Sequence, residues 1–178
     1  MTTVAVDPRF DLTIERLIRA PRRDIWRAWT QPDLLQQWWI PAPMRTRVDH
    51  LDVRPGGAFV TQMSEDGTTY VPHTDSVFLV VEDERRLVFT NAVNSAWRPA
   101  SPQPVAMTAE IILDDHPDGT DYRAVVRHGD PEQRTLHEEL GFFDGWGSVT
   151  DALAALAETG GTSPDTTRMD HSRTNTGI

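Results

Sequence analysis

The sequence predicts one two-layer α+β domain, in which an antiparallel sheet buries one face against a long C-terminal helix. Three observations predict this fold class. Short β-like segments separated by turn residues fill residues 45–128, apolar residues recur at helical spacing over 131–158, and no linker divides residues 9–158. A sheet with a single helix as its apolar partner forms two layers. A sheet that curls strongly around such a helix leaves a pocket between them.

The first elements precede this strand-rich region. Residues 10–18 alternate between apolar and polar, which predicts a strand. Pro21 stands where a helix begins, and apolar residues at helical spacing follow it. Pro32 ends or restarts that helix, and a second short helix runs up to Trp38–Trp39, where the prolines at 41 and 43 stop it.

Six further strands are predicted, over residues 46–53, 57–63, 69–81, 86–92, 105–113 and 120–128. The segment DDHPDGT between the last two has the Asp, Pro and Gly content of a hairpin connection, so we expect its acidic residues at a solvated tip. The Gly56–Gly57 pair predicts a tight turn between strands. It lacks the glycine spacing, the lysine and the following helix of a phosphate-binding loop.

The C-terminal helix has the clearest signals. Asp130 is a capping residue, Pro131 suits the first helical position, and apolar residues then recur at helical spacing to Glu158. A helix of about 28 residues is roughly 40 Å long. The glycines at 141, 145 and 147 interrupt it, which indicates a kink, a close backbone approach or room for another molecule.

Composition excludes several kinds of chemistry. The 178 residues contain 17 basic residues, all arginine, 27 acidic residues and no cysteine, for a net charge of −10. Disulfides, thiolate metal sites, thiol nucleophiles and lysine Schiff bases are therefore excluded. Nucleic acid is not an expected partner, because its binding depends on excess positive charge. No apolar run reaches the roughly 20 residues of a membrane span, and the N-terminus lacks a secretory pattern, so we expect a cytoplasmic protein.

Four segments together resemble a known superfamily. They are RLIRAPRRDIWRAWTQPDLLQQWW, LDVRPGGAF, RRLVFTN and the late Gly145–Trp146. In this order they resemble the START-like (SRPBCC, Bet v 1-like) superfamily, and within it the group of homologues of the activator of heat-shock protein 90 ATPase. The resemblance covers residues 9–158. It implies a helix-grip fold, in which a curved antiparallel sheet of about seven strands wraps around a long C-terminal helix, with two short helices after the first strand and an enclosed cavity.

The remaining segments lie outside this domain. Residues 1–8 are predicted to be a short N-terminal extension. Residues 159–178 contain almost nothing that could enter a core and are predicted to be a disordered tail.

Trp97 lies in a Pro-rich loop, and an exposed tryptophan there is typical of a lid or of a contact between subunits. A homodimer is therefore among the expected states, although the sequence does not identify its surface.

Strand alternation predicts the cavity wall. In the last strand Tyr122 and His128 share a face with alanine and valine, and in the strand before it Met107 faces inward while Glu110 faces outward. A mainly apolar pocket with a few polar groups is typical of small-molecule sites. The predicted ligand-binding residues are Trp39, Met44, Met63, Phe78, Met107, Tyr122, His128, Phe142 and Trp146.

We therefore predict binding of a small, mainly hydrophobic molecule, with no cofactor and no assigned catalytic residue. One alternative is a cyclase- or hydrolase-like enzyme in which His128 and Tyr122 act as acid and base. The other is a module that modulates a chaperone ATPase, with the chaperone as partner, as the resemblance implies. No metal site is predicted, because His73, Asp75, His128 and His137 contain no compact ligand pair. There is also no Gly-x-Ser-x-Gly motif.

Overall fold

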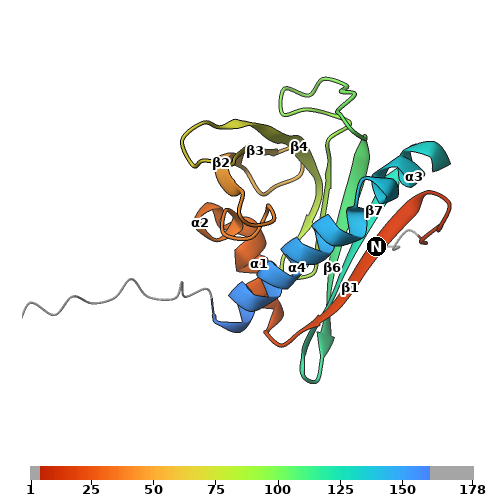
Figure 1. Ribbon diagram of the computed structural model, residues 1–178. Helices are drawn as coiled ribbons and strands as arrows, with labels where there is room; N and C mark the ends of the chain where they lie inside the picture. Colours follow the sequence, from red (N-terminus) through yellow and green to blue (C-terminus); the bar gives the residue numbers. More distant parts are fainter. Residues whose placement is uncertain (1–4, 161–178) are drawn as a thin grey trace, which may run out of the picture.

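The computed structural model describes residues 5–160 and has the α+β helix-grip architecture that the sequence predicts (Figure 1). The chain begins with strand β1 (Asp11–Ile18) and the short helices α1 (Arg22–Thr30) and α2 (Pro32–Leu35). The other elements are β2 (Arg45–Leu51), β3 (Ala58–Ser64), β4 (Val71–Glu82), β5 (Arg86–Thr90), β6 (Met107–His116), β7 (Gly119–His128), α3 (Pro131–Glu139) and α4 (Phe142–Glu158). The tail predicted over 159–178 lies, from residue 161 on, outside the described residues.

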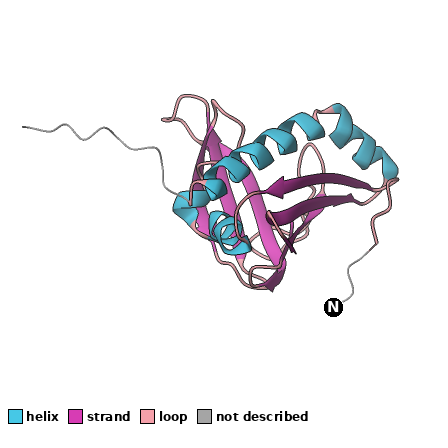
Figure 2. Ribbon diagram, turned by 90° about the horizontal axis from the view of Figure 1, so that it is seen from below, coloured by secondary structure: helices cyan, strands magenta, loops and turns pink. Residues whose placement is uncertain are grey.

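The strands form one antiparallel sheet in the order β1-β7-β6-β5-β4-β3-β2. Strands β2 to β7 follow one another as neighbours, and β1 pairs with β7 at the far edge. The sheet is curved, and the helices lie against its concave face (Figure 2). The turn at 52–57 joins β2 to β3, as expected for the two glycines there. The acidic pair Asp114–Asp115 belongs to the end of β6 rather than to the hairpin turn itself, and both residues are exposed.

Register shifts on β2 and β4 contribute to this curvature. On β2, Asp49 is an extra residue between the pairs that Val48 and His50 make with β3. On β4, His73 is extra relative to β3, and Leu79 is extra relative to β5. Each such β-bulge bends its strand and increases its local twist. The bulge at His73 also changes which face of the sheet that side chain occupies.

An aromatic cluster fills the space between the helices and the middle of the sheet. Trp29, from α1, packs edge-on against Trp38 with ring centroids 4.7 Å apart. The Trp38 indole donates a hydrogen bond to the Ala28 carbonyl over 3.1 Å, so its polar atom is satisfied inside the core. Trp39 then packs on Phe59 at 5.2 Å. The cluster thereby fixes the segment after α2 against the sheet.

The C-terminal helical region is broken into two helices, which corrects the prediction of one continuous helix. The break falls at Leu140–Gly141, where Gly141 has a φ of +92°, a conformation that glycine adopts without a steric penalty. Figure 2 shows α3 and α4 meeting at an angle. The predicted cap is confirmed, because the Asp130 side chain accepts a hydrogen bond from the Gln133 backbone N–H over 2.7 Å. The Cβ positions of Gly145 and Gly147 meet no atom within 4 Å, so no close backbone approach explains these glycines.

The outer face of the sheet contains a buried carboxylate. Glu110 does point away from the helices, as predicted, but only 1% of its surface is exposed. Arg86 and Arg127, from the neighbouring strands β5 and β7, cover it and form ion pairs with its two oxygens over 2.6 and 2.7 Å. An outward-facing glutamate on a central strand is thus buried by the arginine stems beside it.

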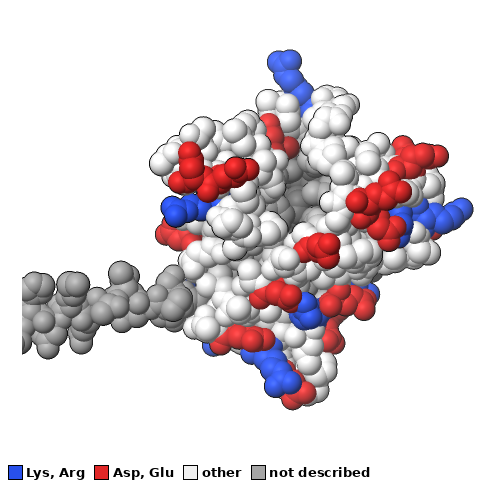
Figure 3. Space-filling model, viewed as in Figure 1, with Lys and Arg blue, Asp and Glu red and all other residues white. Residues whose placement is uncertain are grey.

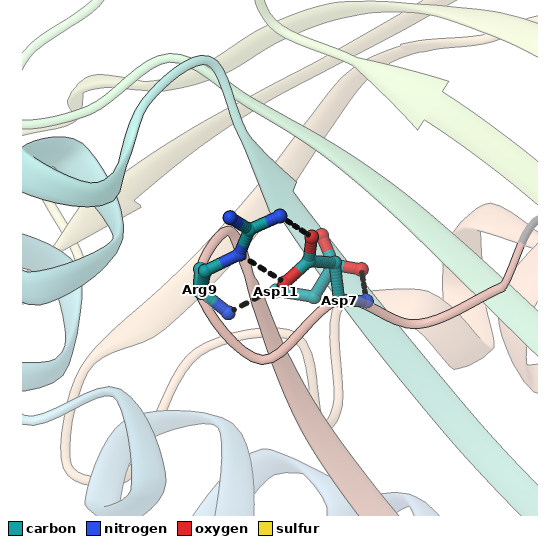
Figure 4. Close-up of polar contacts among 3 residues, drawn as sticks. All are labelled: Asp7, Arg9 and Asp11. Atoms are coloured by element: carbon teal, nitrogen blue, oxygen red, sulfur yellow. Dashed lines mark hydrogen bonds and ion pairs between the residues drawn. The ribbon is translucent and has the colours of Figure 1, made fainter.

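A polar turn precedes β1 (Figure 4). The Asp7 carboxylate accepts hydrogen bonds from the backbone and side chain of Arg9, which lower the pKa of Asp7 to about 2. The Asp11 carboxylate accepts from the Asp7 backbone N–H over 2.8 Å. These bonds order the backbone around Phe10, whose carbonyl group contacts the end of β7.

Candidate functional site

A cavity of about 690 Å³ lies between the sheet and α4. Its walls come from the segment after α2, strands β3 and β4, the connection between β5 and β6, and helices α3 and α4. The lining residues are Trp39, Pro41, Met63, Pro72, His73, Thr74, Asp75, Ser76, Asn91, Asn94, Ala100, Pro102, Gln103, Pro104, Val105, Met107, His137, Gly145, Trp146 and Val149. In Figure 3 a hollow opens in the face shown, and carboxylates stand around it.

Four of the nine predicted ligand-binding residues line this cavity: Trp39, Met63, Met107 and Trp146. The other five lie elsewhere. Phe78, Tyr122 and Phe142 are at most 2% exposed and belong to the packed core. Met44 is half-buried just before β2, and His128 lies at the end of β7.

The reason for this division is the position of the cavity along the sheet. Strand alternation correctly places Tyr122 and His128 on the inner face, but none of the lining residues belongs to β1 or β7. That part of the inner face is closed by core packing, and burial raises the pKa of Tyr122 well above its usual range. Acid–base chemistry by Tyr122 and His128 therefore has no direct access to the cavity.

His73 is brought into the cavity by the bulge on β4. Ser76 and Phe78 point inward, so strict alternation would send His73 outward. As the extra residue of the bulge it lies inside instead, where its Nδ1 is 3.1 Å from the Thr61 hydroxyl and its ring is 6.2 Å from that of Trp39. The surrounding walls lower the pKa of His73 by desolvation, so it is neutral at pH 7.

A chain of hydrogen bonds orients His137 at the cavity wall. The His128 Nδ1 lies 2.9 Å from the Phe10 carbonyl oxygen, so this nitrogen donates. The His128 Nε2 is 2.8 Å from the His137 Nδ1, and in the neutral ring it must accept. His137 then donates through Nδ1, and its Nε2 is left as an acceptor with no partner among residues 5–160. His128 thus acts on the cavity through His137.

Acid should destabilise the protein through these histidines. Desolvation, with a smaller effect of His128, lowers the pKa of His137 from 6.5 to about 4. Since the unfolded chain binds that proton more readily, the free energy of unfolding should fall as the pH decreases from 6.5 to 4. The lowered pKa of Asp7 affects the free energy of unfolding only below this pH range, because its pKa falls from 3.8 to about 2. Thermal melts should show a smaller loss over this range for His137→Gln than for the wild type or for a control variant of the exposed His50. Equal losses in all three would contradict the assignment.

Two buried polar atoms at the cavity wall lack hydrogen-bond partners among the described residues. They are the Oγ of Ser76, a residue with no exposed surface, and the Nε1 of Trp39, which is 7% exposed. A buried polar group without a partner costs on the order of 1–3 kcal/mol. Both atoms have almost no accessible surface, so a ligand or water could bond to them only if the cavity wall moved.

The loop of residues 91–106 closes one side of the cavity and is anchored at both its base and its tip (Figure 1). At the base, the Asn91 side chain accepts from the Met107 backbone N–H over 2.8 Å and donates to the Val105 carbonyl over 3.2 Å. Near the tip, the Ser95 backbone N–H donates to the Asp75 Oδ1 over 2.8 Å. The loop position is therefore coupled to a residue of the cavity wall.

Trp97 does not cover the cavity. It is 70% exposed, and its ring lies over Gly56, so close that any Cβ at that position would be 2.7 Å from it. A lid was one of the two roles expected for Trp97. The side chain does fold back, but it covers the turn between β2 and β3. Its role in a contact between subunits stays a prediction.

Sequence reasoning missed several lining residues. Helical spacing relates Gly145 to Val149 by one turn, which places both on the face that also carries the predicted Trp146. Pro72, inside a strand-like run, was the signal for an irregularity beside His73, because proline in a strand is confined to edges and bulges. No comparable signal marks the contribution of the loop at 100–105.

Within residues 5–160, no three histidine, aspartate or glutamate side chains are grouped so that they could hold a metal ion. In the same range, no helix is both long and apolar enough to cross a membrane.

Comparison with known proteins decides the family. The family model described as "Activator of Hsp90 ATPase homolog 1-like protein" matches residues 19–158. The chain belongs to this family. The activator of Hsp90 ATPase homolog 1-like family has the START-like fold, so the resemblance inferred from the sequence is confirmed. No curated protein matches the chain.

Solved structures of other proteins have the same fold as this chain. A protein from Nitrosomonas europaea is 39% identical, with a TM-score of 0.76 and coverage of 86% of this chain and 97% of that chain. The AHSA1-like protein from Aeromonas hydrophila is 22% identical, with a TM-score of 0.60 and coverage of 85% and 94%. A protein from Arthrobacter aurescens is 19% identical, with a TM-score of 0.73 and coverage of 97% and 98%. The last two show similarity of fold alone. Homodimer formation and a chaperone partner stay predictions.

Proposed function

We propose that the protein binds one small, largely apolar molecule in the cavity between β3, β4 and α4. The observation that carries this proposal is the cavity itself: about 690 Å³ in a domain whose core is otherwise closely packed. Small-molecule sites commonly have volumes of roughly 300–1,000 Å³ and combine an apolar wall with a few polar groups. Membership of a family with the START-like fold supports the same function.

The wall offers two kinds of contact. Tryptophan, methionine, proline and valine side chains present apolar surface, with the Trp39 and Trp146 rings 6.2 Å apart and edge to face. The Ser76 hydroxyl, the Trp39 indole N–H and the His137 Nε2 are polar atoms without protein partners in the described chain. The apolar surface would provide most of the affinity, and the His137 Nε2, which is not one of the buried atoms, would orient the ligand.

An enzymatic role has weaker support in the same geometry. A general base must lie within hydrogen-bond reach of the proton that it removes. Of the two groups predicted for that role, Tyr122 is 2% exposed and His128 is hydrogen-bonded to Phe10 and His137. His73 and His137 do reach the cavity, and a binding function requires only that they accept or donate hydrogen bonds.

Uptake of a neutral fluorescent probe tests the proposal. N-phenyl-1-naphthylamine should bind with a saturable rise in fluorescence at one probe per chain. Native mass spectrometry of freshly purified protein, followed by denaturation, should show whether a species of a few hundred daltons co-purifies in the same site and competes with the probe. A clean unliganded mass together with no saturable probe uptake would overturn the proposal.

A further inference from the structure

Within residues 5–160, the side chains that face the cavity carry no charge at pH 7. Asp75 is the one aspartate, glutamate or arginine among the lining residues. Its side chain points to the outer face of the sheet, because its partner on β3 is Val60, which alternates with the core residue Phe59. His73 and His137 are neutral, since desolvation lowers both pKa values. A charged group that entered the cavity would lose hydration without meeting an opposite charge, which is strongly unfavourable.

The position of the proton on His73 follows from its neighbours. Its Nδ1 lies 3.1 Å from the Thr61 hydroxyl oxygen and 3.3 Å from that of Thr74. Thr61 is 1% exposed, and its hydroxyl has no other partner in the described chain, so its hydrogen points to the Nδ1. A neutral imidazole that accepts at one nitrogen carries its proton on the other. The His73 Nε2–H is therefore a donor.

This donor can be reached by a ligand. His73 lines the cavity and is an exposed residue, and no hydrogen bond joins its Nε2 to any other described residue. The ring lies 6.2 Å from that of Trp39, and Met63 lines the same wall. A hydrogen bond among such apolar neighbours is stronger than one in water. The arrangement suits a ligand with an acceptor atom next to apolar surface.

We propose that the cavity selects a neutral, largely apolar ligand that carries a carbonyl oxygen, such as a ketone or an ester, and that His73 donates to this oxygen through Nε2. This inference rests on the proposed function and specifies the chemical class of its ligand. His137 presents an acceptor at its own Nε2, so it does not compete with His73 for a carbonyl oxygen. Thr61 is a positioning residue, because it fixes the donor state of His73.

Three ten-carbon ligands test the proposal by displacement of N-phenyl-1-naphthylamine at pH 7. Butyrophenone carries a carbonyl group, butylbenzene carries no polar group, and 4-propylbenzoate carries a carboxylate. We expect 4-propylbenzoate to bind at least about tenfold more weakly than butyrophenone. A carboxylate that competes as well as the ketone, or a probe that neither neutral ligand displaces, would overturn the inference and leave the proposed function intact. Failure of the probe itself to bind would instead refute the proposed function.

Substitutions of His73 isolate the hydrogen bond. Since butylbenzene is the more hydrophobic ligand, the quantity to compare is the ratio of the butyrophenone affinity to the butylbenzene affinity within each variant. This ratio should fall about fivefold in His73→Leu, which has no donor, and stay near the wild-type value in His73→Gln, which keeps a side-chain N–H. His50→Leu is the matched control, because His50 is exposed on β2 and does not line the cavity. An unchanged ratio in His73→Leu, or an equal fall in His50→Leu, would remove His73 from the proposed role.

The unsubstituted protein provides a test that does not depend on the folding of a variant. A long-range ¹H–¹⁵N correlation spectrum of the imidazole rings at pH 7 should show His73 protonated at Nε2. The Nε2 signal should shift further on saturation with butyrophenone than with butylbenzene. A ring protonated at Nδ1, or equal shifts with the two ligands, would overturn the inference.

Discussion

Replacing Gly145 with phenylalanine should weaken binding in the cavity at least about tenfold while leaving the protein folded. Gly145 lies on α4 and lines the cavity, and a Cβ added there meets no atom within 4 Å. The new ring therefore enters space that the ligand would occupy. We expect the affinity for N-phenyl-1-naphthylamine to fall by at least about tenfold, which corresponds to about 1.4 kcal/mol. Fluorescence titration measures this directly.

Gly147→Phe is the matched control for this experiment. Gly147 lies on the same helix, its Cβ position is equally open, and it does not line the cavity. Both substitutions replace glycine inside a helix, so both should raise the free energy of unfolding by up to about 1 kcal/mol. The affinity for the probe should fall only in the Gly145 variant. Equal affinities in the two variants would show that the probe binds elsewhere.

Replacing Glu110 with alanine should destabilise the fold strongly. The substitution leaves Arg86 and Arg127, whose side chains are 16% and 19% exposed, without their shared carboxylate. Removing one partner of a buried ion pair costs about 3–5 kcal/mol when the remaining charge has no other compensation. Arg86 keeps the Glu82 carboxylate at 3.8 Å, which reduces this cost. The partial exposure of both arginines favours the lower end. We expect a loss of about 3 kcal/mol, or a melting temperature lower by about 10 °C, measured by thermal and denaturant unfolding.

Two further variants separate charge from truncation at this position. Glu110→Gln keeps the volume and the oxygen acceptor, and should lose less stability than Glu110→Ala. Glu15→Ala removes an exposed glutamate from edge strand β1, and should change stability by less than about 0.5 kcal/mol. If Glu110→Ala were as stable as Glu15→Ala, the ion pairs on the outer face would contribute little to the fold.

The fold could be predicted because its signals are local and repeated. Each element has its own signal: alternation along residues 120–128, the prolines at 21 and 32, and the cap at Asp130. The order of these elements along the chain is compatible with few topologies. The break at Gly141 was foreseen only as one of three readings of the glycines. Whether a helix kinks at a glycine depends on what the two halves pack against, which lies outside the local sequence.

The site was predictable only in part, because the position of a cavity depends on how side chains from several elements pack together. Alternation correctly places Tyr122 and His128 on the inner face, yet it cannot say which part of that face is filled. His73 reaches the cavity through an extra residue in the register of β4, which reverses the side predicted by alternation. The buried state of Glu110 likewise depends on arginines that come from two other strands.

Binding in the cavity between the sheet and α4 can be tested directly by locating the bound probe through the indole N–H signals in a ¹H–¹⁵N correlation spectrum. Trp39 and Trp146 line the cavity, whereas Trp26 lies on α1 and Trp97 is 70% exposed, with its ring over the turn at Gly56. On saturation with N-phenyl-1-naphthylamine, we expect the Trp39 and Trp146 signals to shift and the Trp26 and Trp97 signals to stay in place. Shifts confined to Trp97, or no shift at saturating probe, would contradict it.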